Sequence, residues 1–288
     1  MSTHSAAVIE KIDCHFHIID LRRFPLAKGM GYHPRSDESG TFAEMSETFK
    51  LHGVRAGLAV QPSGYGYDNR ALLDAIEKSS GSLMGIGAAE PGCTLEELAD
   101  LQEQGVVGLR FNLVDFDERG LAHTQAGRLL SMMNELGMFV DIQCSPDKLM
   151  EAAPLLLKSR AKILVDHCGR PDPSRGVGEK SFQGLLRLSD YSEMFIKLSG
   201  PFRESHEPFP HRDLDSFVHQ IVDAFSVKRC VWGSDWPFIN MGSKPRPVYE
   251  QTISWISGLL SEDQLKSVFM DTPTRLFGFK AGNSDGDQ

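Results

Sequence analysis

The sequence predicts an α/β fold, a closed (β/α)8 TIM barrel with an extra helix at its C-terminal end. The chain has 288 residues, which is about the length of one such barrel. Short β-rich runs alternate with helical stretches at a fairly even spacing, and no Pro/Gly/Ser-rich linker interrupts them. Because strands that alternate with helices form parallel sheets, eight such units favour a barrel.

Eight apolar runs are expected to be strands, at residues 11–18, 54–61, 83–89, 106–112, 138–144, 161–167, 195–199 and 229–235. Helices are expected between them at residues 68–78, 94–104, 124–136 and 146–158, with a kink at Pro154 in the last of these. The stretch 261–277 predicts one or two helices packed on the outside. An open doubly wound sheet is the alternative, but no Gly-x-Gly-x-x-Gly turn supports it.

Composition limits the class of protein. One barrel domain is expected at residues 11–280, between short tails at 1–10 and 281–288. With 41% hydrophobic residues and no apolar run long enough to cross a bilayer, a soluble cytoplasmic protein without a membrane partner is expected. The net charge of −9 argues against a nucleic-acid partner. The five scattered cysteines indicate reduced thiols. The oligomeric state is left open.

Two histidines close the first expected strand. Since side chains alternate along a strand, Asp13, His15 and His17 are expected on one face and the residues between them on the other. Two adjacent imidazoles either bind a metal or donate hydrogen bonds to a substrate oxygen. The last expected strand ends in Asp235, which is the carboxylate available for the same site.

Other strands also end in polar groups. In a barrel the site collects at the C-terminal ends of the strands, so these groups are candidates for it. Each of these residues alone has an ordinary structural explanation, as a core histidine, a salt-bridge partner or a turn residue. Packing alone, however, seldom places ionisable groups at the ends of so many apolar strands. The expected catalytic residues are His15, His17, His167 and Asp235. The expected substrate-binding residues are Arg110, Arg203, Ser63, Tyr65, Asn112 and Arg170.

The motifs Asp13-x-His15-x-His17, Val165-Asp-His-Cys-Gly-Arg170 and Trp232-Gly-Ser-Asp235 resemble those of the amidohydrolase superfamily. They are most similar to its branch that contains 2-pyrone-4,6-dicarboxylate lactonase and sugar-acid lactonases. The resemblance implies a distorted (β/α)8 barrel and a hydrolase that opens a cyclic ester. It also implies operation without a metal, for which that lactonase branch is known.

The residue types support the same expectation about the metal. In the metal-using relatives, the ligands are the two histidines of the first strand, the aspartate of the last strand, and a further His on strand five or a Lys or Glu on strand four. This chain has Gln143 on strand five and Arg110 on strand four. Neither is a good ligand, and a guanidinium repels a cation. No cofactor is therefore expected. If zinc bound weakly, its ligands would be His15, His17 and Asp235.

Without a metal, Asp235 is the expected general base for water, with the three histidines as donors to the oxyanion. Arg110 is expected to bind a substrate carboxylate, helped by Arg203, Ser63 and Tyr65. Phe116 stands where the resembled lactonase has a further arginine, so one carboxylate-binding group is missing. The expected substrate is therefore either a monocarboxylate or sugar-acid lactone or a pyrone dicarboxylate. The alternatives are a zinc-dependent decarboxylase or amidohydrolase of the same barrel, a lactone isomerase, and a non-catalytic binding barrel.

Overall fold

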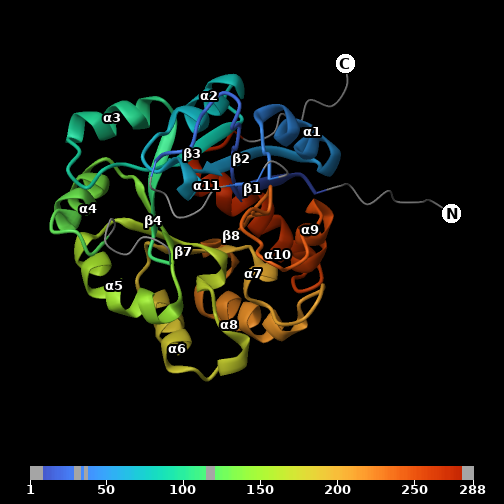
Figure 1. Cartoon of the computed structure of the whole chain (residues 1–288). Coiled ribbons are helices and arrows are strands. Elements are labelled where there is room, and N and C mark those ends of the chain that lie inside the picture. Colours follow the sequence, from blue (N-terminus) through green and yellow to red (C-terminus); the bar gives the residue numbers. More distant parts are fainter. Residues whose placement is uncertain (1–8, 29–33, 36–37, 115–120, 281–288) are drawn as a thin grey trace, which may run out of the picture.

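The computed structural model describes residues 9–28, 34–35, 38–114 and 121–280, and they form the expected barrel (Figure 1). The eight strands lie in one sheet in the order of the chain, and every neighbouring pair from β1 to β8 is parallel. Their bounds are β1 Lys11–Phe16, β2 Val54–Val60, β3 Leu83–Gly87, β4 Val106–Asn112, β5 Phe139–Gln143, β6 Lys162–Val165, β7 Met194–Leu198 and β8 Cys230–Trp232. All eight expected strands are confirmed, most of them shortened at one or both ends.

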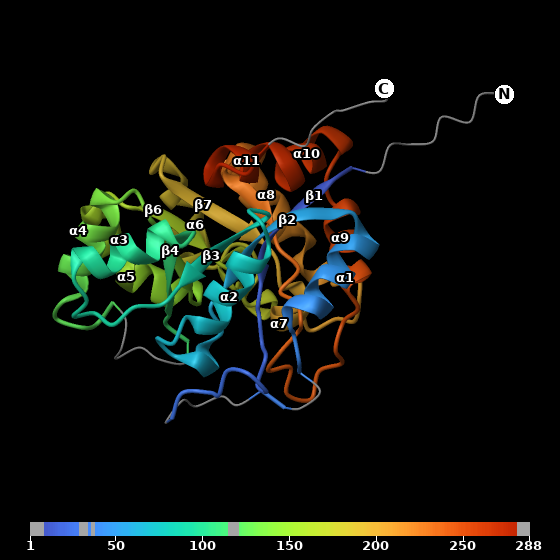
Figure 2. The same cartoon turned by 90° about the horizontal axis from the view of Figure 1, so that it is seen from above.

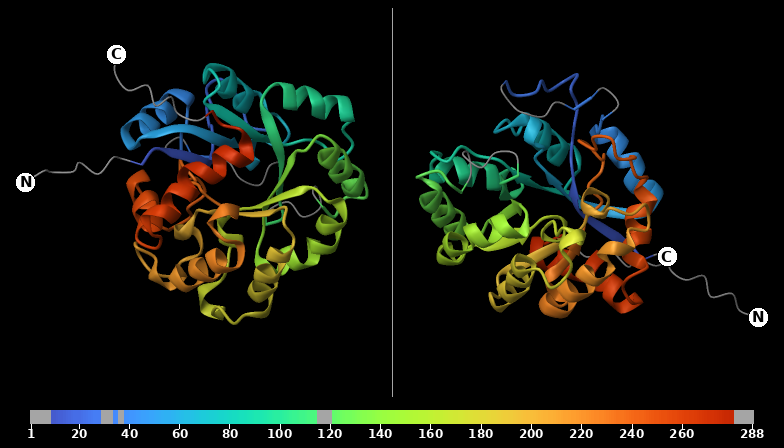
Figure 3. Two further views of the ribbon diagram at one scale, coloured as in Figure 1. Left: turned by 180° about the vertical axis from the view of Figure 1, so that it is seen from behind. Right: turned by 60° about the horizontal axis from the view of Figure 1, so that its bottom comes forward.

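The helices surround the strands (Figure 3). They are α1 Phe42–His52, α2 Arg70–Lys78, α3 Leu95–Glu103, α4 Ala126–Glu135, α5 Pro146–Ser159, α6 Lys180–Arg187, α7 Pro201–Glu204, α8 Asp215–Phe225, α9 Tyr249–Ser257, α10 Glu262–Lys266 and α11 Thr272–Phe277. The capping box that Thr94 and Glu97 predict begins α3. Helix α5 continues through Pro154 to Ser159. None of the described helices is long and apolar enough to cross a membrane.

The barrel closes at the C-terminal ends of β1 and β8. Phe16 and Trp236 form a parallel bridge, and Asp235 N donates to His15 O at 2.7 Å. The amide of His17 donates to Trp236 O at 2.8 Å. The residues that close the barrel are therefore neighbours of the expected catalytic groups, so closure also holds these groups beside each other.

The expectation for Asp13 is wrong. The pairing of β1 with β2 shifts register between Asp13 and Phe16, which breaks the alternation of faces. Asp13 faces α9, where its Oδ2 accepts from Tyr249 Oη at 2.7 Å. Cys14, expected on the opposite face from His15, lies in the apolar cluster inside the barrel. His15 and His17 still reach the same site.

The C-terminal segment is only partly on the outside. Helices α10 and α11 are joined by a π-helical turn at Ser267–Asp271, and both lie at the end of the barrel opposite the segment that follows β1 (Figure 2). Phe277 and Phe279 join the interior apolar cluster, and the ring of Phe277 lies 5.0 Å from that of Phe139. Phe277 and Phe279 therefore fill the N-terminal mouth of the barrel.

Candidate active site

A pocket opens at the C-terminal ends of the strands, the position expected for a barrel enzyme. It is lined mostly by polar side chains of β4 and β5 and of the segments that follow β1, β2, β6, β7 and β8. Its lining residues are His17, Ser63, Arg110, Asn112, Gln143, His167, Arg203, Asp235, Ile239 and Asn240. Seven of the ten residues expected at the site line this pocket, and an eighth, His15, lies against Asp235.

Asp235 is the centre of this arrangement. It is fully buried and its backbone is in the left-handed region, with φ of 64°. Its Oδ1 lies 3.4 Å from His17 Nε2 and 3.7 Å from His15 Nε2, and its Oδ2 lies 4.0 Å from His167 Nε2. Burial favours the neutral acid, but the Arg203 guanidinium, the largest opposing cause, holds the pKa of Asp235 well below its usual range. Asp235 is therefore an ionised carboxylate.

His17 is an acceptor toward this carboxylate. Its Nδ1 lies 2.8 Å from Val60 O, and since a carbonyl oxygen only accepts, Nδ1 carries the hydrogen. Burial lowers the pKa of His17, so the ring is neutral and Nε2 presents its lone pair. Asp235 Oδ1 has no hydrogen-bond partner among the described residues. Two acceptors that face each other in this way suit a water molecule that donates to both.

His15 is in the opposite state. Its Nδ1 lies 3.1 Å from Nζ of Lys197, a fully buried side chain on β7. The same nitrogen also lies 3.1 Å from Asp166 Oδ1, a carboxylate that already pairs with Lys197 and Arg110. A hydrogen on Nδ1 would oppose the ammonium group, which can only donate, so we assign Nδ1 as the acceptor and place the hydrogen of the neutral ring on Nε2. Burial drives the pKa of His15 well below its usual value. His15 Nε2 is buried without a partner in the described structure and lies beside Asp235, so it is a donor available to a substrate oxygen.

Lys197 belongs to a buried network of charges beneath the pocket. Its three hydrogens face three acceptors: Asp141 Oδ1 at 2.6 Å, Asp166 Oδ1 at 2.9 Å and His15 Nδ1 at 3.1 Å. Burial alone would discharge the ammonium, but the two carboxylates raise the pKa of Lys197. Burial and the neighbouring Asp166 raise the pKa of Asp141 to about 7. The network holds His15 from below, on the side away from the pocket.

His167 begins the turn after β6, with φ of 52°. Its Nδ1 lies 2.9 Å from Ser199 Oγ, and its Nε2 faces Asp235. Burial lowers the pKa of His167 to about 3, so this ring is also neutral. A serine hydroxyl can donate or accept, so Nε2 of His167 is able to carry the hydrogen when Ser199 donates to Nδ1.

Arg110 lines the same pocket as Asp235 and is partly engaged by the protein. Its Nη1 donates to Gln61 O at 3.2 Å, and its Nη2 bonds to Gln143 Oε1 and lies 3.3 Å from Asp166 Oδ2. Its Nε has no partner among the described residues. Asn112 Nδ2 donates to Ser63 Oγ at 3.0 Å beside it. Arg110 therefore keeps donor capacity in a rigidly held position.

Two expected substrate-binding residues, Tyr65 and Arg170, lie outside the lining of this pocket, and a third, Arg203, lines it but is paired within the protein. Tyr65 is fully buried outside the pocket lining, and its Oη accepts from Asp20 N at 3.0 Å, so it is a structural residue. Arg170 pairs with Glu204 at 2.5 Å and lines a separate polar pocket. Arg203 lines the catalytic pocket, but its Nε is the ion partner of Asp235. The expectation placed these residues by sequence proximity to strand ends, whereas turns after β2, β6 and β7 redirect the side chains.

A family model described as amidohydrolase matches residues 12–279 of the chain. The chain belongs to the amidohydrolase family. It is 29% identical over 270 residues to a 4-sulfomuconolactone hydrolase of Rhizobium radiobacter, and the match covers 92% of this chain and 89% of that protein. It is similar to the crystal structure of a Pseudomonas putida protein assigned as a 2-pyrone-4,6-dicarboxylic acid hydrolase. The TM-score is 0.85 at 28% identity, over 95% of this chain and 99% of that one.

A member of the same fold carries zinc, which makes a metal site a question for this chain. That protein is an amidohydrolase of Burkholderia multivorans with a TM-score of 0.74 at 20% identity, covering 94% of this chain and 100% of its own. In the described part of this chain, ligand atoms of His15, His17 and Asp235 lie within 4.8 Å of one another, and so do those of His15, Asp166 and His167. Groups that could hold a metal ion are therefore present.

These groups fit zinc poorly. A ligating imidazole needs a lone pair toward the metal. His17 Nε2 offers one, but His15 Nε2 carries its hydrogen because Lys197 occupies Nδ1. Asp235 Oδ1 has no partner in the described structure and could bind a cation, but the Arg203 guanidinium on Oδ2 of the same carboxylate places a positive charge beside it. Binding through His15 Nε2 would also require this ring to move its hydrogen to Nδ1.

Sequence reasoning missed the two residues that hold His15 from below, Lys197 and Asp141. Each sits inside a short apolar run, in Met194–Leu198 and Phe139–Gln143. A charged residue in the middle of a buried strand is itself a signal, because such a side chain is rarely buried unless it is paired.

Proposed function

We propose that this protein hydrolyses a small lactone that bears a carboxylate, and that it does so without a metal. The observation that carries the proposal is the buried, ionised Asp235 with a free Oδ1, set between a histidine acceptor and a histidine donor. The relatives in the amidohydrolase family support the reaction class, since one is named for a sulfomuconolactone and another for a pyrone dicarboxylic acid.

The nucleophile is a water molecule held by Asp235 Oδ1 and His17 Nε2. As the water oxygen forms a bond to the lactone carbonyl carbon, its proton passes to Asp235 and the carbonyl π electrons move to the oxygen. When the tetrahedral intermediate collapses, the ring C–O bond breaks and the alkoxide or enolate takes the proton from Asp235. The product is an open hydroxy acid or its keto form, and the carboxylate of Asp235 is restored.

The oxyanion needs donors on the other side of the carbonyl carbon. His15 Nε2 is the donor that the Lys197 contact selects, and His167 Nε2 is the second candidate. A donor aimed at a developing oxyanion is typically worth about 3 kcal/mol. This division of roles refines the expectation from the sequence, because neutral His17 accepts at Nε2 rather than donates.

Metal-free operation follows from the same contacts. Arg203 supplies positive charge next to Asp235 and keeps the carboxylate ionised. Without a metal-bound hydroxide, water must be activated by this carboxylate alone. A lactone is a suitable substrate because an ester needs less activation than an amide, and its leaving group stays attached to the product.

Arg110 is proposed to bind the substrate carboxylate. Replacing Arg110 with Met should raise KM at least about 10-fold for a carboxylate lactone, since a charge-assisted hydrogen bond is worth about 1.5 kcal/mol or more. The control substrate is the methyl ester of the same lactone, which lacks the charge. An equal effect on both substrates would show that Arg110 holds the barrel together, through Gln61, Gln143 and Asp166, rather than the substrate.

Product analysis separates hydrolysis from the alternatives. A hydrolase releases an open acid and consumes one water, whereas an isomerase with the same oxyanion donors returns a ring-shifted lactone. The two products differ by the mass of one water, so mass spectrometry of the reaction with a lactone panel distinguishes them. Appearance of a ring-shifted lactone alone would contradict hydrolysis.

A further inference from the structure

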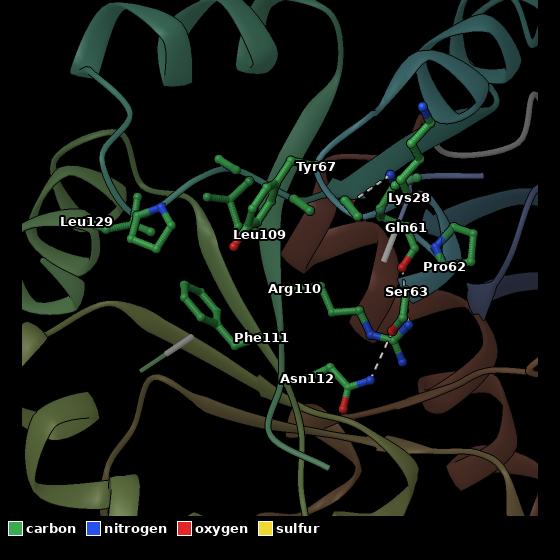
Figure 4. Close-up of a pocket in the computed structure, with 15 residues that line it drawn as sticks. Lys28, Gln61, Pro62, Ser63, Tyr67, Leu109, Arg110, Phe111, Asn112 and Leu129 are labelled. Atoms are coloured by element: carbon green, nitrogen blue, oxygen red, sulfur yellow. Dashed lines mark hydrogen bonds between the residues drawn. The ribbon is translucent and has the colours of Figure 1, made fainter. Parts of the chain in front are cut away.

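A second cavity adjoins the catalytic pocket at the ends of β2, β3 and β4 (Figure 4). Its volume is about 240 Å³. It shares Ser63, Arg110 and Asn112 with the catalytic pocket, so a ligand held by Arg110 borders both spaces. In Figure 4, Leu109, Phe111 and Leu129 lie on one side of Arg110, and Ser63 and Asn112 lie on the other.

The wall of this cavity is mostly apolar. Its apolar lining includes the loop residues Ala88, Ala89 and Pro91 after β3, together with Leu109, Phe111 and Leu129. The charged side chains in the described lining are Arg110 and Lys28, and no acidic side chain lines it. Lys28 is exposed, so its ammonium group is solvated. The catalytic pocket has a different lining, because most of its side chains are polar or charged.

Two buried polar atoms of lining residues lack hydrogen-bond partners within the described structure. They are Oε1 of Gln61 and Nε of Arg110. A buried polar atom without a partner indicates a water or a ligand group that is present when the site is filled. The Arg110 Nε donor suits a carboxylate or ring oxygen of the lactone, and the Gln61 Oε1 acceptor suits a water or a substrate hydroxyl group beside it, with the rest of the molecule in the apolar part.

We infer that this cavity is a substrate subsite that takes an uncharged, apolar substituent of about the size of a benzene ring, carried by the lactone whose carboxylate Arg110 binds. The inference rests on the proposed function and deepens it. An apolar cavity of ~150 Å³ is enough to bind benzene, so this one accommodates a phenyl ring or a short alkyl chain. A second anionic group would lose its hydration against an apolar wall without an ion partner there.

The test compares three carboxylate lactones that differ in one ring substituent: methyl, phenyl or a second carboxylate. The phenyl lactone should have a kcat/KM at least about 10-fold above the other two, because only its substituent fills the cavity. Ala89→Leu fills part of the cavity and should remove this advantage, so that the kcat/KM of the phenyl lactone falls to about that of the methyl lactone measured on the same variant. Ala99→Leu, on α3 outside the cavity lining, is the matched control and should retain it.

Binding of the ring-opened acids, measured by calorimetry, tests the subsite without turnover. The phenyl acid should bind to the wild-type protein at least about 10-fold more tightly than the methyl acid. On Ala89→Leu the two acids should bind with equal affinity. If the methyl and dicarboxylate ligands match or exceed the phenyl ligand in both measurements, the subsite inference is overturned while lactone hydrolysis stands. If no lactone opens but the phenyl acid shows this binding pattern, the proposed function fails and the apolar subsite stands.

Discussion

The barrel interior has two layers that come from the same strands and differ in chemistry. Phe139 and Asp141 on β5 are two residues apart, so both face the interior, and the same holds for Phe195 and Lys197 on β7. The layer at the N-terminal end is apolar and packs on Phe277, whereas the layer above it is charged. On each of these strands, the apolar residue that stabilises the fold and the charged residue that supports the site are only two positions apart.

The two layers differ in what burial does to the free energy of unfolding. Burying an aromatic ring in the lower layer is favourable by itself. Burying Lys197 and its two carboxylates is costly, and their mutual attraction offsets the cost only because the geometry supplies three acceptors for three hydrogens. The role of the charged upper layer is therefore to position His15, and it is not expected to add to the stability of the fold.

The first prediction isolates the lower layer. Phe139→Ala should lower the free energy of unfolding by about 3–5 kcal/mol, because it leaves a cavity against Phe195 and Phe277. Turnover per folded molecule should stay within about twofold, since Phe139 contacts no group of the site. Denaturant titration and kcat on the same preparation measure the two effects. A large loss of kcat with a small loss of stability would contradict the separation of layers.

The second prediction concerns the base. Asp235→Asn should keep the fold and reduce kcat at least about 100-fold, because the amide cannot take a proton from water. Circular dichroism controls for folding. Arg203 loses its ion partner in this variant, so Asp235→Glu, which keeps the charge, is measured beside it and should retain more activity. An Asn variant with normal turnover would remove Asp235 from the mechanism.

The third prediction concerns the upper layer. Lys197→Met should reduce kcat about 100-fold with little change in KM, since His15 then moves its hydrogen to Nδ1, toward Asp166 at 3.1 Å, and loses its donor at Nε2. The double variant Lys197→Met/Asp141→Leu removes the carboxylate that the single change leaves unpaired. Ring ¹⁵N resonances of labelled histidine identify the protonated nitrogen. A hydrogen that stays on Nε2 in both variants would refute the positioning role of Lys197.

Much of the fold was predictable because the strand pattern is local. Apolar runs bounded by turns identify all eight strands, and their C-terminal ends indicate where His15, His17 and Asp235 meet. The orientation of Asp13 was not predictable, since the register shift in β1 depends on the pairing with β2. The burial of Phe277 in the N-terminal mouth of the barrel was also not predictable, because helical spacing does not indicate against which element a helix packs.

The site was predictable in its residue types but not in its partners. Arg203 lies on the short helix α7, and only the folded chain brings it to Asp235. Tyr65 and Tyr67 are two residues apart, yet Tyr65 is buried against the Asp20 amide while Tyr67 lines the second cavity. These differences come from turns after the strands, whose conformations the sequence pattern does not specify.

The most direct test of the central claim measures zinc and turnover on the same protein. Protein purified without added metal and treated with a chelator is assayed on a carboxylate lactone, and its zinc content is determined by elemental analysis. The metal-free mechanism predicts full turnover with well under one equivalent of zinc, because Arg203 and the Nε2 hydrogen of His15 disfavour binding of the ion. Stoichiometric zinc whose removal abolishes turnover, and whose return restores it, would contradict it.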